Sequence, residues 1–383
     1  MRVTTYAYPW DLANLGVEAT LKGMADEGFE AVELASTYHP IDSFSPRGGA
    51  RLYTSARGAV FFPTRPERYG RIRPVEGEAD VCAAWPQAAR AASKLGLGLN
   101  AWTITLFQPW IRDAYPDTAR VFPGGDPSGS GICPANEDVR EFFANLCADA
   151  VDQFSVGMVR LENLTPHTYD LDWMRPRVLF AVPPLARTLL TLCFCGACER
   201  QASAKGIDVQ RLRGTVNGAI AEEITEGPGA PASAERTARL AADAELAAYA
   251  MLNVEGSIRL IRTVAARVKP AKISSAAASP FGAIVGAKAE QSLREQFAGA
   301  VDQLVFQPGA DEANQRLAEI VARTPDPPSI AMLMSHIQDP EQLDKALRRA
   351  AGMGAGEVGL YNYGIMQAKD AAAFAAAARR LAA

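Results

Sequence analysis

A short strand-like run followed by a helical pattern recurs eight times along the chain, and this alternation restricts the fold more than any other feature. The runs that predict strands are Val3–Tyr6, Ala31–Leu34, Leu97–Thr103, Met158–Glu162, Lys272–Ala276, Gln303–Phe306, Ile330–Met334 and Val358–Tyr361. The periodicity predicts helices at about Val17–Glu27, Trp85–Leu95, Asp138–Phe154, Ser233–Arg267, Ala287–Ala298, Asp311–Ala322, Pro340–Ala351 and Ala371–Leu381. Eight such units predict a (β/α)8 barrel, or TIM barrel. A doubly wound open sheet is the alternative, but the closing C-terminal helix fits the barrel better.

The length of the chain agrees with one barrel that carries insertions. All 383 residues, 1–383, are predicted to form a single domain, because α/β barrels with insertions reach this size. Long segments without strand or helix signals follow the second and fourth strands, at about 37–85 and 163–231. Loops of this length in a compact domain are usually functional or disordered.

Charge and hydropathy exclude two classes of partner. The formal net charge is -4 and the pI is about 5.6, so no basic surface is expected to bind nucleic acid. No stretch approaches the roughly 18 apolar residues of a membrane span, and the N-terminus lacks the apolar core of a signal peptide. The sequence therefore predicts a cytoplasmic protein.

One predicted strand ends in a carboxylate. The run Met158–Glu162 delivers Glu162 to the point where the strand gives way to a loop, with Arg160 and Asn163 beside it. The carboxyl ends of barrel strands form the active-site face, so an ionisable residue there favours a catalytic role. The alternative is a solvated glutamate that merely ends a strand.

Aromatic and polar side chains cluster at the other predicted strand ends. The residues predicted to bind substrate are Tyr6, Tyr8, Trp10, Tyr38, Trp102, Asn163, Gln307, His336, Tyr361 and Tyr363. Aromatic rings pack on the C–H faces of sugars while polar groups bind the hydroxyls, so this set predicts a cleft for a small carbohydrate or glycoside. Trp102 is expected to stack on the sugar. Ordinary packing at the barrel end is the competing interpretation for several of these rings.

A glycoside hydrolase normally needs two carboxylates. Glu162 is the expected general acid, and Glu33, Asp42, Asp170 and Asp172 are candidates for the second carboxylate. Glu33, at the end of its strand, is our catalytic assignment, although a buried ion pair with Arg160 is its competing interpretation. His39 is assigned a role in orienting a substrate hydroxyl or relaying a proton.

The segment Cys193-Phe-Cys195-Gly-Ala-Cys198 is the most distinctive local motif. Three thiols in C-x-C-x-x-C spacing can converge on one metal, which predicts a structural zinc site. Its fourth ligand would be His167, Cys133 or water, and free thiols packed under a loop are the alternative. Cys82 and Cys147 are expected to be small core residues.

Several motifs together resemble a family of uncharacterised TIM-barrel proteins grouped as hypothetical glycoside hydrolases. The resemblance covers roughly residues 1–215 and rests on Tyr38-His39-Pro40, on the element beginning Cys133-Pro134-Ala135-Asn136, on Leu161-Glu162 and on the Cys-Phe-Cys-x-x-Cys loop after strand four. It implies a glycoside hydrolase that requires no cofactor for hydrolysis. The large retaining clan of barrels places a nucleophile after strand seven, where this chain has Ser335-His336 instead of a carboxylate.

Two other functions stay open from the sequence. The run Gly28–Leu34 also looks like the second strand of xylose-isomerase-like barrels, which would imply a metal-dependent sugar isomerase or epimerase. A carbohydrate-binding barrel without catalytic activity would keep the aromatic cleft and lack the second carboxylate.

Overall fold

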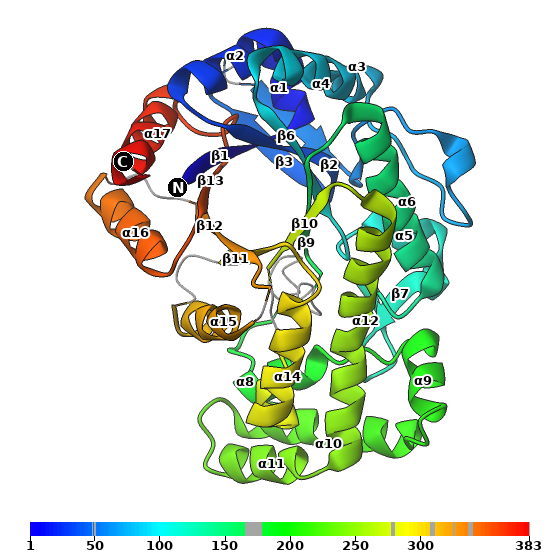
Figure 1. Cartoon of the computed structure of the whole chain (residues 1–383). Coiled ribbons are helices and arrows are strands. Elements are labelled where there is room, and N and C mark those ends of the chain that lie inside the picture. The colour runs from blue at the N-terminus through cyan, green and yellow to red at the C-terminus, as the bar shows by residue number, and fades with distance from the viewer. Residues whose placement is uncertain are drawn as a thin grey trace.

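The computed structural model describes residues 1–47, 49, 51–164, 178–276, 280–306, 311–324, 326–335 and 340–382. Its centre is a closed barrel of eight parallel strands, which confirms the predicted fold (Figure 1). The strands are β1 (Arg2–Ala7), β2 (Ala31–Tyr38), β6 (Gly98–Ile104), β9 (Met158–Glu162), β10 (Lys272–Ser275), β11 (Gln303–Phe306), β12 (Ser329–Ser335) and β13 (Glu357–Tyr361). The barrel closes because β1 pairs in parallel with both β2 and β13.

Helices surround the barrel in Figure 1, as the sequence predicts. They are α2 (Val17–Glu27), α4 (Ala84–Leu95), α6 (Glu137–Phe154), α12 (Ala244–Val268), α14 (Ala287–Ala298), α15 (Asp311–Arg323), α16 (Pro340–Gly352) and α17 (Ala368–Ala382). The long helix predicted at 233–267 is in fact two helices. The first, α11, spans Ala232–Ala241. Asp243 then caps α12 by accepting hydrogen bonds from the amides of Glu245 and Leu246.

Three insertions carry most of the remaining elements, and the sequence predicted two of these insertions. The one after β2 holds the antiparallel pair β3 (Ile41–Ser45) and β4 (Arg51–Ser55), then β5 (Ala59–Val60), η1 (Pro66–Arg68) and α3 (Ala79–Cys82). The unpredicted one follows β6 and holds α5 (Pro109–Ala114), η2 (Pro116–Thr118), β7 (Ala119–Val121) and β8 (Pro127–Ile132). The one after β9 holds α8 (Pro184–Leu190), α9 (Gly196–Ser203) and α10 (Val209–Glu226), and it leads into α11.

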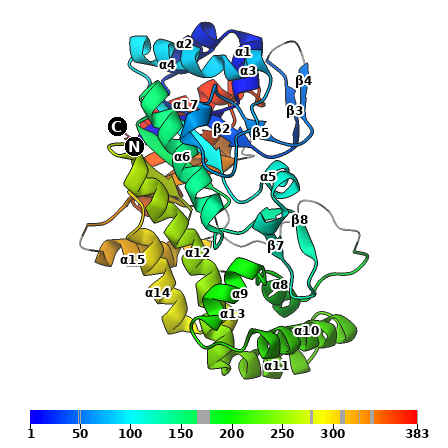
Figure 2. The same ribbon diagram turned by 90° about the vertical axis from the view of Figure 1, so that its right-hand side faces the viewer.

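The hairpins β3–β4 and β7–β8 project from the same side of the molecule in Figure 2. Two short helices lie outside these insertions: α1 (Pro9–Leu15) follows β1, and α13 (Gly282–Val285) follows β10. Within the described ranges, no helix combines the length and the apolar character that a bilayer span requires.

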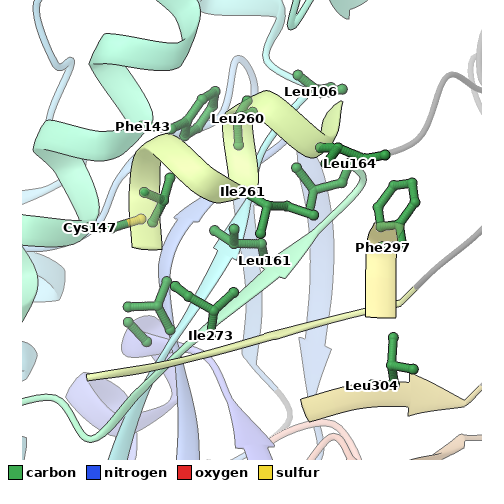
Figure 3. Packing of buried hydrophobic residues seen from close by; sticks show 14 of the residues in the cluster. Leu106, Phe143, Cys147, Leu161, Leu164, Leu260, Ile261, Ile273, Phe297 and Leu304 are labelled. Atoms are coloured by element: carbon green, nitrogen blue, oxygen red, sulfur yellow. The ribbon is translucent and has the colours of Figure 1, made fainter. Parts of the chain in front are cut away.

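The core between the strands and α12 fixes which residues of β9 face inward. Leu161 packs beside Leu260 and Ile261 of α12, as Figure 3 shows, and Cys147 of α6 lies in the same apolar layer. Side chains alternate along a strand, so Arg160 and Glu162 point to the barrel interior. This alternation positions the candidate site.

Candidate active site

The lower part of the barrel interior is a buried network of charged and amide side chains. Arg160 lies at its centre: Nε is 3.2 Å from Glu33 Oε2, and Nη2 is 2.8 Å from Glu357 Oε1. The same Nη2 donates to Gln303 Oε1 at 3.1 Å, and Asn100 Nδ2 donates to Glu33 Oε1 at 2.8 Å. We call these five residues the ion-pair layer. All five are at most 4% exposed, so the layer fills the barrel and leaves its carboxylates paired.

Glu162 lies at the upper end of the same interior face. Its Oε2 accepts a hydrogen bond of 2.6 Å from the indole N–H of Trp102, which orients the carboxyl. Burial raises the pKa of Glu162, whereas the Trp102 hydrogen bond and the charge of Arg160 act in the opposite direction. A carboxyl with a raised pKa stays protonated to higher pH than an ordinary glutamate, which suits a proton donor.

Glu162 opens into a cavity of about 440 Å³ at the carboxyl ends of the strands. The polar part of its wall consists of Tyr8, Tyr38, Asp42, Ser43, Glu162 and Tyr361. The apolar part consists of Ile41, Phe44, Leu333 and Ile365. The volume falls within the range of small-molecule sites, and Phe44 is 55% exposed at the cavity wall.

Three tyrosine hydroxyls meet on one side of this cavity. The Tyr8 hydroxyl lies 3.0 Å from that of Tyr38 and 2.6 Å from that of Tyr361, and the last two are 3.1 Å apart. We call them the tyrosine triad. Burial raises the pKa of each phenol, so all three stay protonated near neutral pH. Each hydroxyl has one O–H and two lone pairs, so a triangle of three can use its donors internally and still accept from a ligand.

The other predicted aromatic residues lie elsewhere. Trp102 is fully buried beneath the triad, with its ring edge-on to Tyr6, so it offers no open face to a sugar, contrary to expectation. Tyr6 is buried with it. Trp10 lines a neighbouring cavity and stacks on Tyr53 at 4.4 Å between ring centroids. Tyr363 lines a third cavity, donates to Glu27 Oε1 and packs against the guanidinium of Arg47.

The other residues predicted to act at the site either do not line the cavity or lie outside the described part of the chain. Glu33 belongs to the ion-pair layer and does not line the cavity. His39 is buried against the Phe107 ring, and burial lowers its pKa to about 4, which keeps the ring neutral. The main-chain carbonyl of Asn163 accepts hydrogen bonds from Thr105 and Leu106. The residues that lie outside the described ranges are His167, Asp170, Asp172, Gln307 and His336.

The structure brings the three cysteines of the motif together with a fourth. The sulfur atoms of Cys133, Cys193, Cys195 and Cys198 lie within 4.8 Å of one another, and all four side chains are buried. The described residues contain no other close group of three or more His, Cys, Asp or Glu. Cys82 and Cys147 lie apart from the cluster and are buried, as predicted.

Sequence reasoning weighed Asp42 without assigning it, and it missed the apolar cavity wall. Asp42 and Phe44 lie on β3, within the insertion predicted at about 37–85. In the structure residues 43 and 45 are buried and 42 and 44 exposed, but the sequence Ile41-Asp42-Ser43-Phe44-Ser45 has no matching alternation of apolar and polar residues. Because side chains alternate along a strand, β3 places Asp42 and Phe44 on one face.

The chain matches no family model, and no curated protein matches it. Among solved structures, it is similar to alpha-L-fucosidase isoenzyme 2 from Paenibacillus thiaminolyticus, at 11% identity and a TM-score of 0.57. It is also similar to a beta-galactosidase from the psychrophilic Marinomonas ef1, at 12% identity and a TM-score of 0.56. All of this chain aligns in both cases, but it spans only 50% and 60% of those chains.

A third similar structure is the PgaB (BpsB) glycoside hydrolase domain from Bordetella bronchiseptica, at 14% identity and a TM-score of 0.50, with 94% of both chains covered. At such low identities these similarities establish the fold alone. The chain has a TIM barrel of the kind found in glycoside hydrolases.

Proposed function

We propose that this protein hydrolyses a glycosidic bond, with Glu162 as the general acid. The observation that carries the proposal is a carboxyl of raised pKa that opens into a cavity containing a second carboxylate, Asp42. The protonated Glu162 would give its proton to the leaving oxygen as the bond breaks. The Trp102 N–H holds the carboxyl in place for this transfer.

Asp42 is proposed as the second carboxylate, in place of Glu33. Glu33 is neutralised by Arg160 in the ion-pair layer, whereas Asp42 is exposed on β3 and accepts a hydrogen bond of 2.8 Å from the Thr54 hydroxyl. A carboxylate in this position would activate water or attack the sugar directly.

The cavity wall supports a sugar as the ligand. Sugar hydroxyls would donate to the lone pairs of the tyrosine triad, while the apolar wall would pack on C–H groups. The isomerase alternative has less support, because the described residues around Glu162 do not assemble a group of carboxylates and histidines able to bind a divalent ion.

The proposal is tested by assaying the full chain against a panel of aryl glycosides that differ in the sugar. We expect hydrolysis of at least one member, a fall of about 100-fold or more in Asp42→Asn, and partial rescue of that variant by azide, a small external nucleophile. The exposed Asp26 of α2, which does not line the cavity, supplies the control Asp26→Asn. Sugar binding by calorimetry without hydrolysis of any panel member would identify a non-catalytic carbohydrate-binding barrel and overturn the proposal.

A further inference from the structure

We propose that Cys133, Cys193, Cys195 and Cys198 bind one zinc ion, which fastens the insertion after β9 to the barrel. The site is separate from the Glu162 cavity, and the inference does not depend on glycoside hydrolysis. It rests on the arrangement of the four sulfurs, on the chain around them and on the elements that they join.

The spacing of the sulfurs fits a single tetrahedral ion. Four thiolates at about 2.3 Å from a common zinc are about 3.8 Å from one another. In the structure all four sulfurs lie within 4.8 Å of one another, and those of Cys133 and Cys198 are 3.5 Å apart. An iron–sulfur cluster, with several metal atoms at its centre, would hold its four thiolates farther apart. The small space between the sulfurs therefore favours one ion.

The ligand set is closed, which indicates a structural role. Structural zinc sites have four protein ligands, whereas catalytic sites keep one position for water or substrate. All four cysteines here are buried, and they supply all four ligands. The sulfur-only set also selects a soft ion such as zinc over magnesium or calcium.

The chain around the motif is held by hydrogen bonds that do not involve the sulfurs. The amide of Cys193 donates to Asn253 Oδ1 at 2.7 Å, and the Tyr249 hydroxyl donates to the Cys193 carbonyl at 2.8 Å. The buried guanidinium of Arg120 donates to the Thr191 carbonyl, which brings a positive charge to the same loop. Zinc with four thiolates carries a net charge of about -2, and a nearby buried cation offsets the cost of burying it.

The cluster joins both flanks of the strand that carries Glu162. Cys133 follows β8 and lies just before α6, the helix that leads into β9. Cys193 and Cys195 follow α8, and Cys198 lies in the first turn of α9. All three belong to the insertion that comes after β9. One ion would thus tie the chain before β9 to the chain after it.

The test is the metal content of the full chain, purified without metal-affinity resin or chelator. We expect about one zinc per chain by elemental analysis, released when a mercurial reagent blocks the thiols and detected with a colorimetric zinc indicator. Cys195→Ser should lose the zinc and expose the segment 178–227 to limited proteolysis. Cys147→Ser, which removes a buried thiol outside the cluster, is the matched control and should keep both the zinc and the protection.

The metal content of the unmodified chain decides the outcome even if Cys195→Ser fails to fold. A metal-free protein with these four thiols free, or with disulfides among them by mass spectrometry, would overturn the proposal. One equivalent of iron in place of zinc would overturn the assignment of the ion. Loss of zinc from Cys147→Ser as readily as from Cys195→Ser would show that the cluster is not the binding site.

Discussion

Arg160 and Glu162 are two residues apart on β9 and both face the barrel interior, yet their surroundings are opposite. Arg160 is enclosed by Glu33, Glu357 and Gln303, so its charge is balanced inside the protein. Glu162 has an uncharged partner, the Trp102 indole, and opens into a cavity. The same strand therefore holds one charge that is paired inside the barrel and one carboxyl that lines a cavity.

This contrast shows that facing the barrel interior does not by itself place a glutamate at the candidate site. Glu33 and Glu162 are both inward-facing glutamates on barrel strands, but Glu33 is the third residue of β2 and Glu162 is the last residue of β9. Only the end position reaches the face where ligands bind. The ion-pair layer fills the barrel below, and the residues above it form the candidate site.

The largest expected effect comes from removing the cation of the ion-pair layer. Arg160→Met would leave Glu33 and Glu357 buried without their shared partner and should cost about 3–5 kcal/mol of unfolding free energy. Denaturant unfolding monitored by circular dichroism measures it. Arg348→Met, which breaks an exposed pair with Asp344, is the control, with an expected cost of about 0.5 kcal/mol or less. Equal small losses in the two variants would show that the layer does not stabilise the barrel.

A third buried carboxyl, Asp11, differs from both glutamates: it has no cation as close as that of Glu33, and it lines the neighbouring cavity of Trp10 instead of the Glu162 cavity. Burial raises its pKa to about 7 from 3.8, against the opposing effects of Ser45 and Arg47. Neutral Asp11 therefore makes its full contribution to the free energy of unfolding below pH 3.8, and this contribution is lost as pH rises towards 7. Asp11→Asn should remove this loss, so that the variant gains stability over the parent between pH 4 and 7, by up to about 4 kcal/mol.

Thermal and denaturant unfolding across that pH range measure the effect. Asp26→Asn, at an exposed position, is the surface control. If the difference in unfolding free energy between the parent and Asp11→Asn stayed constant with pH, the raised pKa of Asp11 would be contradicted.

A smaller effect is expected from Trp102, which holds Glu162 without lining the cavity. Trp102→Phe removes the N–H that favours the ionised carboxyl, so the pKa of Glu162 should rise further. The alkaline limb of the pH–rate profile should then move to higher pH. Trp85→Phe is the matched control, because Trp85 is equally buried and its N–H donates at 2.9 Å to the Ala35 carbonyl instead. An alkaline limb that moves equally in both variants, or in neither, would show that the Trp102 hydrogen bond does not control the pKa of the catalytic acid.

The sequence predicted the barrel because strand and helix periodicity is local, and the same periodicity located Glu162 at a strand end. It could not predict that Tyr38 and Tyr361 cover Trp102, because these residues come from strands far apart in the chain. The sequence did not predict the break between α11 and α12, because the alanine-rich helical pattern continues across it. The sequence left three possible fourth ligands for the cysteine cluster. Only the fold shows that Cys133, 60 residues before Cys193 in the sequence, lies beside the other three cysteines.

We propose that Glu162 serves chemistry and that Glu33 serves stability. The decisive experiment measures kcat/KM and the free energy of unfolding for Glu162→Gln and Glu33→Gln side by side, on a glycoside that the parent hydrolyses. We predict that Glu162→Gln loses at least about 100-fold in kcat/KM and about 1 kcal/mol or less of stability. Glu33→Gln should instead lose about 2 kcal/mol or more of stability and keep most of the activity of its folded fraction. Activity of Glu162→Gln within a few-fold of the parent, or a similar collapse of activity in a fully stable Glu33→Gln, would contradict the account.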